Sequence, residues 1–437
     1  MLTTLKNAFK IKEIRQKILF TLGMLVVIRI GSQLPVPGVD TKFFSQWFAQ
    51  QTGGAFSFFD AITGGSFLNM SILALNINPY ITSSIIMQLL TIAIPKLEEM
   101  QRDGEDGRKK MVAITRYVTV ALALIQSTAM AIGFGRQGYL IEFNALNVIT
   151  TITALTAGSA FLMWVGERIT EKGIGNGISI VLVINIISRL PQDLSNLFEQ
   201  FVFGKAPATA ILAVVIIFAI IIAMVVLVII LNDGVRKIPV QYAKKMQGRK
   251  MVGGQTSNIP LKVNTSGVIP IIFAQSIMQF PIIICSFIGY NGTGVWAEIL
   301  KGLNSGYWCK PSQPIYSLGL LLYIVLIVFF AYFYTSITFN PLMIADNMKK
   351  QGGFIPGIRP GQPTSAYITR VVNRVTLVGA VCYAVLAMVP VVLQWIFKVN
   401  VGFGGTTLII VVGVCLDIVK ALESQLLMRH YKGFLND

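Results

Sequence analysis

Long stretches without a charged side chain constrain this sequence more than any other feature. Three of them, at 61–95, 263–297 and 311–345, each run for 35 residues without Asp, Glu, Lys or Arg. Only 13% of the 437 residues are charged and 54% are hydrophobic, whereas a soluble globular chain is about 25% charged. In lipid the backbone must satisfy its own hydrogen bonds, so such stretches predict membrane-spanning helices. An ordinary soluble enzyme and a disordered chain are excluded.

The apolar stretches predict ten spans, and therefore an all-α polytopic membrane protein. The spans are expected at 18–34, 72–94, 112–133, 149–166, 174–187, 208–231, 267–288, 315–335, 376–397 and 404–422. With a cytoplasmic N-terminus, the predicted cytoplasmic segments hold 28 Lys and Arg and the exterior loops hold 7. This fourfold excess is a positive-inside signal, and removing one span would reverse every later loop. Both termini are expected in the cytoplasm.

The ten spans divide into two groups of five. The second span of each group carries the proline breaks and the polar residues, with Pro79 in one and Pro270 and Pro281 in the other. Because five is odd, equivalent groups would be inverted relative to each other in the membrane. The expected organisation is a cytoplasmic N-terminus at 1–17, a first half at 18–192, a second half at 193–425 and a cytoplasmic tail at 426–437. Residues 1–17 form either an amphipathic surface helix or a basic tail that follows topology.

The segment at 52–67 differs from an ordinary lipid-facing helix. It combines small, polar and aromatic residues, and its glycine pairs at 53–54 and 64–65 break helix propagation. An irregular segment at membrane depth must be buried in protein or line a water-filled cavity. We therefore predict that residues 56–67 form a short half-helix folded back into the bundle. The alternative is an exterior loop packed on the surface.

Residues that carry catalytic or metal chemistry are few. The chain has one histidine, His430, and four cysteines whose spacing suggests neither a disulfide framework nor a zinc site. It has no Gly-x4-Gly-Lys-Ser/Thr phosphate loop, and ionisable residues are scarce at the middle of the predicted spans. We predict a protein that is not an enzyme and that has no metal and no cofactor.

A basic cluster lies in the predicted cytoplasmic loop at 232–262. Its six charges are Arg236, Lys237, Lys244, Lys245, Arg249 and Lys250. Such a cluster can meet nucleic acid or an acidic protein, and membrane topology alone explains it equally well. Because long loops in compact proteins are usually functional, 232–262 and the second long loop, 336–374, are predicted docking surfaces.

Six short motifs stand in order along the chain. They are RIGSQLPVPG at 29–38, NPYI at 78–81, GIGNGIS at 173–179, PLKVN at 260–264, FIPGIRPG at 354–361 and GGT at 404–406. Together they closely resemble the SecY/Sec61-alpha family, the pore subunits of protein-conducting channels. The resemblance runs from about residue 10 to about residue 430 and implies ten helices in two inverted halves around a central hourglass pore.

The resemblance also implies roles for individual residues. The constriction of the pore would be formed by Ile77, Ile81, Leu182, Ile272 and Ile410. Leu182 stands where the family more often has Ile, a change that conserves volume. The segment 56–67 would be the plug that closes the exterior funnel, with Phe56, Phe58, Phe59, Asp60, Ile62, Gly64 and Gly65.

A side exit to lipid, the lateral gate, would open between the second and third spans and the seventh and eighth. By position, its seam holds Thr82, Gln88, Asn264 and Phe280. The two long loops would dock a motor or ribosome, through the six basic residues above and through Arg359. The implied partners are SecE and SecG subunits, the SecA motor ATPase, the ribosome, signal sequences, unfolded preproteins and membrane lipids, with no direct DNA binding. The implied location is a bacterial plasma membrane.

Two other function classes fit a polytopic chain. An inverted-repeat secondary transporter of a small solute shares the architecture, although it usually places ionisable groups at mid-membrane. An intramembrane enzyme is the less favoured class, because the sequence shows neither a histidine dyad nor a mid-membrane pair of aspartates.

Overall fold

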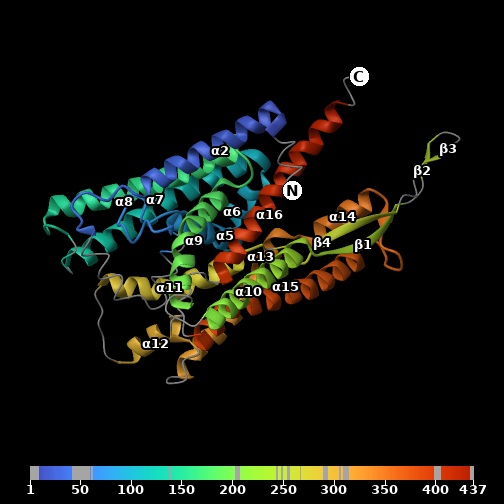
Figure 1. Cartoon of the computed structure of the whole chain (residues 1–437). Helices are drawn as coiled ribbons and strands as arrows, with labels where there is room; N and C mark the ends of the chain where they lie inside the picture. The colour runs from blue at the N-terminus through green and yellow to red at the C-terminus, as the bar shows by residue number, and fades with distance from the viewer. Residues whose placement is uncertain are drawn as a thin grey trace.

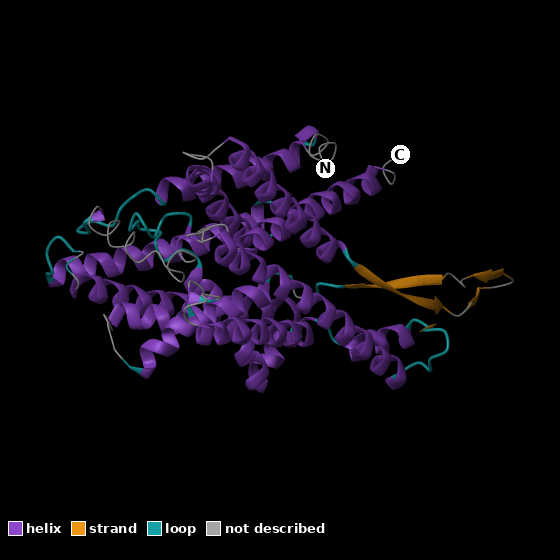
Figure 2. Ribbon diagram, turned by 60° about the horizontal axis from the view of Figure 1, so that its bottom comes forward, coloured by secondary structure: helices purple, strands orange, loops and turns teal. Residues whose placement is uncertain are grey.

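The computed structural model describes most of the chain as a helical bundle. The described residues are 9–41, 60, 63–136, 138, 140–201, 207–242, 245–247, 250–252, 256–265, 267–288, 294–304, 307–308, 314–397 and 405–433. Within them, long helices lie side by side and a strand pair projects from one end of the bundle (Figure 1; Figure 2). The mostly helical architecture expected from the sequence is confirmed.

Each expected span overlaps one helix of the described residues. The first half contains α2 (Lys12–Gly31), α5 (Asn78–Ala93), α6 (Pro95–Arg102), α7 (Gly104–Arg136), α8 (Ala145–Lys172) and α9 (Gly177–Phe201). The second half contains α10 (Pro207–Asp233), α11 (Ile269–Ile288), α12 (Val295–Leu303), η2 (Pro314–Ser317), α13 (Leu318–Thr338), α14 (Pro341–Lys350), α15 (Gln362–Phe397) and α16 (Gly405–Gly433). Among the described residues, six helices are long and apolar enough to span a membrane alone, and the bent pair α5–α6 makes a seventh. The count of ten stays a prediction.

Most helix ends differ by several residues from the predicted boundaries, and two of these differences concern residues discussed below. Residues 72–77 were expected in the second span, but they form turns, and α5 begins only at Asn78. Asn76 adopts φ +52, a left-handed conformation that interrupts helix propagation. The fifth span was expected to end at 187, whereas α9 continues to Phe201 through Arg189 and Pro191.

Proline explains the sharp bend after α5. The axes of α5 and α6 differ by 108°. Ile94, between them, is extended at φ −115 and ψ 109, because the ring of Pro95 disfavours a helical conformation in the preceding residue. The chain therefore leaves the bundle at Ile94 and returns along α7, which α6 contacts.

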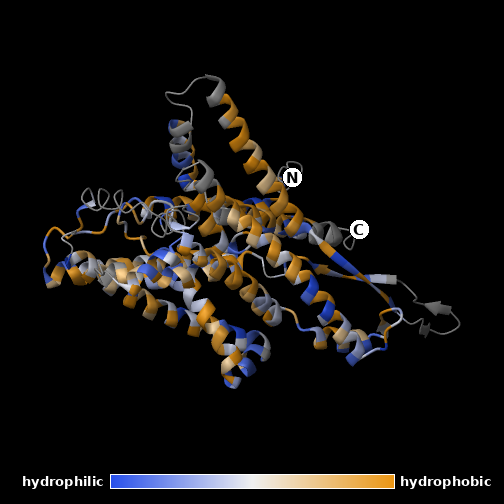
Figure 3. Ribbon diagram, turned by 90° about the horizontal axis from the view of Figure 1, so that it is seen from below, coloured by the Kyte–Doolittle hydropathy of each residue, from blue (hydrophilic) through white to orange (hydrophobic). Residues whose placement is uncertain are grey.

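The helices pack mainly within their own half. In the first half α7 packs against α5 and α8, and α8 packs against α9. In the second half α11 packs against α13, α13 against α15, and α10 against α16. Contacts between α7 and α11, and between α9 and α16, join the two halves. The long helices are largely hydrophobic along their length, whereas the projecting strand pair is hydrophilic (Figure 3).

The two long loops form a small sheet that the sequence did not predict. β1 (Val235–Tyr242) pairs antiparallel with β4 (Thr256–Lys262), from Val235 opposite Lys262 to Gln241 opposite Thr256. The other edge of β1 pairs with β5 (Gly353–Phe354), and β2 (Lys245–Gln247) pairs with β3 (Lys250–Val252) in a separate pair. Residues from both loops share one apolar core, which contains Ile238, Val240, Leu261, Met348, Ile355 and Ile368. The loops 232–262 and 336–374 therefore form one joint structure.

Candidate functional site

The five predicted constriction residues lie inside the protein. Ile77, Leu182 and Ile410 are buried, at 1%, 7% and 2% exposure. Ile81 and Ile272 are half-buried. Four helices contribute them: Ile81 lies on α5, Leu182 on α9, Ile272 on α11 and Ile410 on α16, while Ile77 immediately precedes α5.

Adjacent apolar clusters hold four of these five residues. Ile77 belongs to a cluster that Ile81 packs against, and Ile410 belongs to a cluster that Ile272 packs against. Ile418 of α16 packs against both clusters and therefore connects them. Both halves thus supply aliphatic side chains to neighbouring parts of the interior.

Of the predicted plug, 56–67, the structure describes residue 60 and residues 63–67, which precede α5. Phe56, Phe58, Phe59 and Ile62 lie outside the described residues, whereas Asp60, Gly64 and Gly65 lie inside them. From Gly64 to Ile77 the chain forms mostly turns, and Gly64 and Gly65 take positive φ values of +65° and +82°. Asp60 is fully buried, and so is Phe67 at 1% exposure. The described residues of this segment therefore pack into the bundle.

Buried amides fix the end of this segment. The Asn185 amide nitrogen on α9 donates to the side-chain oxygen of Asn76 at 3.1 Å. The Ser159 hydroxyl on α8 donates to the Asn76 carbonyl oxygen at 3.2 Å. Asn76 is 1% exposed and directly precedes Ile77, so these bonds locate the start of α5 against α8 and α9.

The predicted lateral-gate residues occupy different surroundings. Thr82 is half-buried and its hydroxyl donates to the Asn78 carbonyl within α5. Gln88, also half-buried on α5, places its amide nitrogen 3.5 Å from the Ser84 hydroxyl. Phe280 on α11 is 54% exposed.

Asn264, the fourth predicted gate residue, lies in a polar triad of the second half. Its amide nitrogen donates to the Asn232 side-chain oxygen of α10 at 2.7 Å and to the Tyr383 hydroxyl of α15. The Tyr383 hydroxyl lies 3.1 Å from the same Asn232 oxygen. These hydrogen bonds tie Asn264 to α10 and α15, whereas Thr82 and Gln88 bond within α5.

The predicted docking residues lie at the sheet end of the molecule. Arg236 and Lys237 are exposed on β1, and Arg359 is exposed in the turn after β5. Because β5 pairs with β1, Arg359 belongs to the same joint structure as Arg236. Lys245 and Lys250 lie in β2 and β3, and Lys244 and Arg249 lie outside the described residues.

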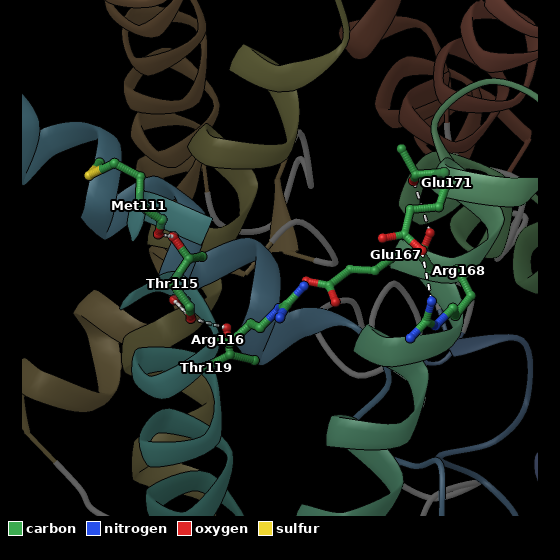
Figure 4. Close-up of polar contacts among 10 residues, drawn as sticks. Met111, Thr115, Arg116, Thr119, Glu167, Arg168 and Glu171 are labelled. Atoms are coloured by element: carbon green, nitrogen blue, oxygen red, sulfur yellow. Dashed lines mark hydrogen bonds and ion pairs between the residues drawn. The ribbon is translucent and has the colours of Figure 1, made fainter. Parts of the chain in front are cut away.

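Sequence reasoning missed an ion pair that joins α7 and α8. The Arg116 Nε lies 2.7 Å from the Glu167 Oε1 (Figure 4). At the preceding residue of α7, the Thr115 carbonyl oxygen accepts the Ser83 hydroxyl of α5. Glu167 and Arg116 stand 51 positions apart in the chain, so no local pattern could have paired them.

Three comparisons with known proteins agree on one family. The SecY family model matches residues 71–419. Two similar relatives are named Protein translocase subunit SecY. The one from Streptomyces galbus is 43% identical over 100% of both chains, and the one from Escherichia coli K12 is 41% identical over 97% of this chain and 94% of its own.

Solved structures show the same fold. One titled "The structure of a protein conducting channel" aligns with a TM-score of 0.63 at 18% identity, over 94% of this chain and 92% of that one. Another, "Sec61 in the Canine ribosome-channel complex from the endoplasmic reticulum", aligns with a TM-score of 0.59 at 18% identity over the same shares.

Proposed function

The chain belongs to the SecY family, and we infer that it is the pore subunit of a protein-conducting channel in a membrane. It passes unfolded secretory polypeptides through its centre and releases transmembrane segments sideways into lipid. The alternative of a small-solute transporter is not supported, since the similar proteins are translocase subunits and protein-conducting channels.

The observation that carries this proposal is the placement inside the protein of five aliphatic residues from both halves, three of them buried and two half-buried. Aliphatic side chains can pack around an extended chain of any sequence, because they make no directional bonds with it. At rest, a narrow apolar neck excludes water and therefore resists ions. The proposed constriction can therefore pass polypeptides of any sequence and still block ions at rest.

We place the lateral gate at the contact between α7 and α11. An apolar signal segment gains roughly 0.8 kcal/mol for each CH₂ that it removes from water. It shifts the closed state toward the open one only if it binds the open seam more tightly. The exposed Phe280 and the half-buried Thr82 and Gln88 supply a surface of mixed polarity for that binding.

The sheet end of the molecule is the proposed docking surface for the SecA motor or the ribosome. Exposed Arg236, Lys237 and Arg359 give it positive charge, and the shared apolar core makes it a rigid platform.

SecE and SecG are the proposed membrane partners. The apolar helix α10 suits such a partner or lipid, because only 17% of its apolar window is buried within this chain. The proposed location is a bacterial plasma membrane.

Replacing constriction residues with glycine tests the channel directly. The double variant Ile81→Gly and Ile272→Gly widens the proposed neck, and we expect a severalfold rise in resting ion conductance across planar bilayers. The matched control is Ile92→Gly with Ile277→Gly, which makes the same change at exposed positions of the same two helices. Equal conductance in the two double variants would remove the constriction assignment.

A charge reversal tests the docking surface. We expect Arg359→Glu to impair motor-driven export while the protein still inserts into the membrane. Arg370→Glu is the control, since it makes the same change at an exposed position of α15 outside the turn. Normal export by the Arg359 variant would contradict the docking role.

A further inference from the structure

Three ionisable side chains meet where the segment before α5 touches α9. The carboxylate of Asp60, which is fully buried, forms an ion pair with the guanidinium of Arg189. A second carboxylate, that of Asp193, lies 3.9 Å from the Arg189 Nε. The Arg189 and Asp193 side chains are 17% and 9% exposed. Burying a charge costs free energy unless it is paired, so Asp60 is stable in this position only while Arg189 faces it.

Asp60 also organises its own segment. Its Oδ1 accepts the Leu68 backbone N–H at 3.0 Å, and its backbone carbonyl accepts the Thr63 hydroxyl at 3.1 Å. The same carbonyl accepts the Gly65 N–H at 3.2 Å. Because these bonds join Asp60 to residues 63–68, a force on the Asp60 carboxylate is transmitted to that turn.

Gly64 brings the same turn into close contact with α9 and α2. A Cβ atom at Gly64 would lie 2.6 Å from the Asn185 carbonyl oxygen, so only glycine permits this approach. The Gly64 carbonyl oxygen accepts from the Arg29 Nη1 at 3.3 Å and lies 3.5 Å from the Ser188 hydroxyl. The stretch 185–193 of α9 therefore holds the turn at two points.

These contacts lie close to the proposed constriction. Arg189 follows Leu182 by seven residues on α9, which is about two helical turns. Asn185, between them, holds Asn76 next to Ile77. A movement of the turn can therefore affect the residues of the proposed constriction.

We propose that Arg189 is a positioning residue of the channel, whose ion pair with buried Asp60 holds Asp60 and the turn at 63–68 against α9 and so sets how readily this turn leaves its resting position. This inference rests on the proposed channel function and on the plug role that the family resemblance implies for this segment. Arg29 contributes a second cation, through the Gly64 carbonyl.

Asp193 makes separation of the Asp60–Arg189 ion pair reversible. It lies one turn along α9 from Arg189, on the same helix, and stays there when the segment departs. When Asp60 leaves, Asp193 keeps the Arg189 cation paired, which lowers the free-energy cost of opening. Loss of Asp193 and loss of Asp60 should therefore change the opening equilibrium in opposite directions.

Accessibility of a buried cysteine measures the departure of the turn without relying on transport. Ser66 is 2% exposed inside the turn, so Ser66→Cys reports its departure with a small change in volume. In a background with the four native cysteines replaced by serine, intact cells are treated with a membrane-impermeant maleimide. We expect Arg189→Gln and Asp60→Asn each to raise the labelling rate about tenfold or more. Asp193→Asn should lower it, and Arg189→Lys, which keeps the cation, should give an intermediate rate.

The control is Arg136→Gln, which removes an exposed positive charge at the end of α7. Its labelling rate should equal that of the parent. An unchanged rate in both Arg189 variants, or a rate raised by Asp193→Asn, would overturn the proposed role of the Asp60–Arg189 ion pair. If Arg189→Gln fails to accumulate, the labelling rates of Arg189→Lys and Asp193→Asn still test the proposal, because they are expected to change in opposite directions.

Preprotein export measured in the same cells separates this inference from the proposed function. If the parent exports preprotein normally but all variants are labelled at the same rate, the proposed role of the Asp60–Arg189 ion pair is contradicted and the channel role stands. Graded labelling with no export by the parent overturns the channel role, while the ion pair still holds the segment.

Discussion

Two equivalent helices, α5 and α11, begin in similar ways but are fastened to different parts of the molecule. An asparagine precedes each one: Asn76 bonds to α8 and α9, and Asn264 bonds to α10 and α15. Each asparagine therefore ties its helix to its own half. Directional hydrogen bonds between buried groups define one arrangement, since displacement leaves a donor or acceptor unsatisfied.

The contact between the halves is of another kind. Ile85 of α5 shares an apolar cluster with Ile271 and Phe273 of α11, and α7 packs against α11. Apolar contacts are non-directional, and lipid tails can replace them when the helices part. The comparison shows that directional hydrogen bonds hold α5 and α11 to their own halves, whereas non-directional apolar contacts join the halves at the proposed gate.

The largest effect is expected where α8 passes close to the backbone of the segment before α5. At Gly158 of α8 a Cβ would lie 2.0 Å from the Ile72 carbonyl oxygen, so Gly158→Ala forces α8 away from the segment before α5. We expect a loss of about 3 kcal/mol, read as a lower thermal unfolding midpoint in detergent. The control is Gly23→Ala in α2, where nothing lies within 4 Å and alanine favours the helix. Equal midpoints for the two variants would show that this contact does not hold the half together.

The second prediction concerns the polar triad of the second half. Asn264→Ala leaves the Asn232 oxygen and the Tyr383 hydroxyl without this donor, and we expect a loss of about 1.5 kcal/mol. Thr265→Ala is a neighbouring control, because its hydroxyl donates to the Lys262 carbonyl three residues earlier, in a solvent-exposed hydrogen bond within the same turn. If Asn264→Ala is as stable as this control, the triad is not what fastens α11.

The third prediction addresses the seam. Ile85→Val removes one methylene from the shared apolar cluster, and we expect the free energy of unfolding to fall by about 1 kcal/mol, read as a lower unfolding midpoint. Signal-sequence crosslinking to α11 should nevertheless increase, because a weaker seam opens more often. A variant with unchanged crosslinking would argue against an apolar gate at this contact.

The sequence was most informative about the helices that contact lipid and least informative about contacts between distant residues. An uncharged stretch such as 208–231 predicts α10 directly, because hydrophobicity is a local property. The fifth span was predicted to end at 187, before Arg189, but α9 continues to Phe201. The buried partner of Arg189, Asp60, stands far away in the chain, so no local pattern reveals it. The pairing of β1 with β5 was missed for the same reason: the two strands come from different loops.

The smallest effect is expected for the ion pair between Arg116 and Glu167. Both side chains reach solvent, at 49% and 20% exposure, so water and salt weaken their attraction. A double-mutant cycle with Arg116→Gln and Glu167→Gln should give a coupling of about 0.5 kcal/mol at low salt, falling toward zero at about 1 M salt. The pair Arg168–Glu171, within α8 alone, is the matched control, and its coupling should not affect how α7 and α8 stay together. A coupling of about 2 kcal/mol that persists in salt would mean that this surface ion pair stabilises the first half as strongly as the buried asparagine does. The difference between polar contacts within a half and apolar contacts between the halves would then include the protein surface.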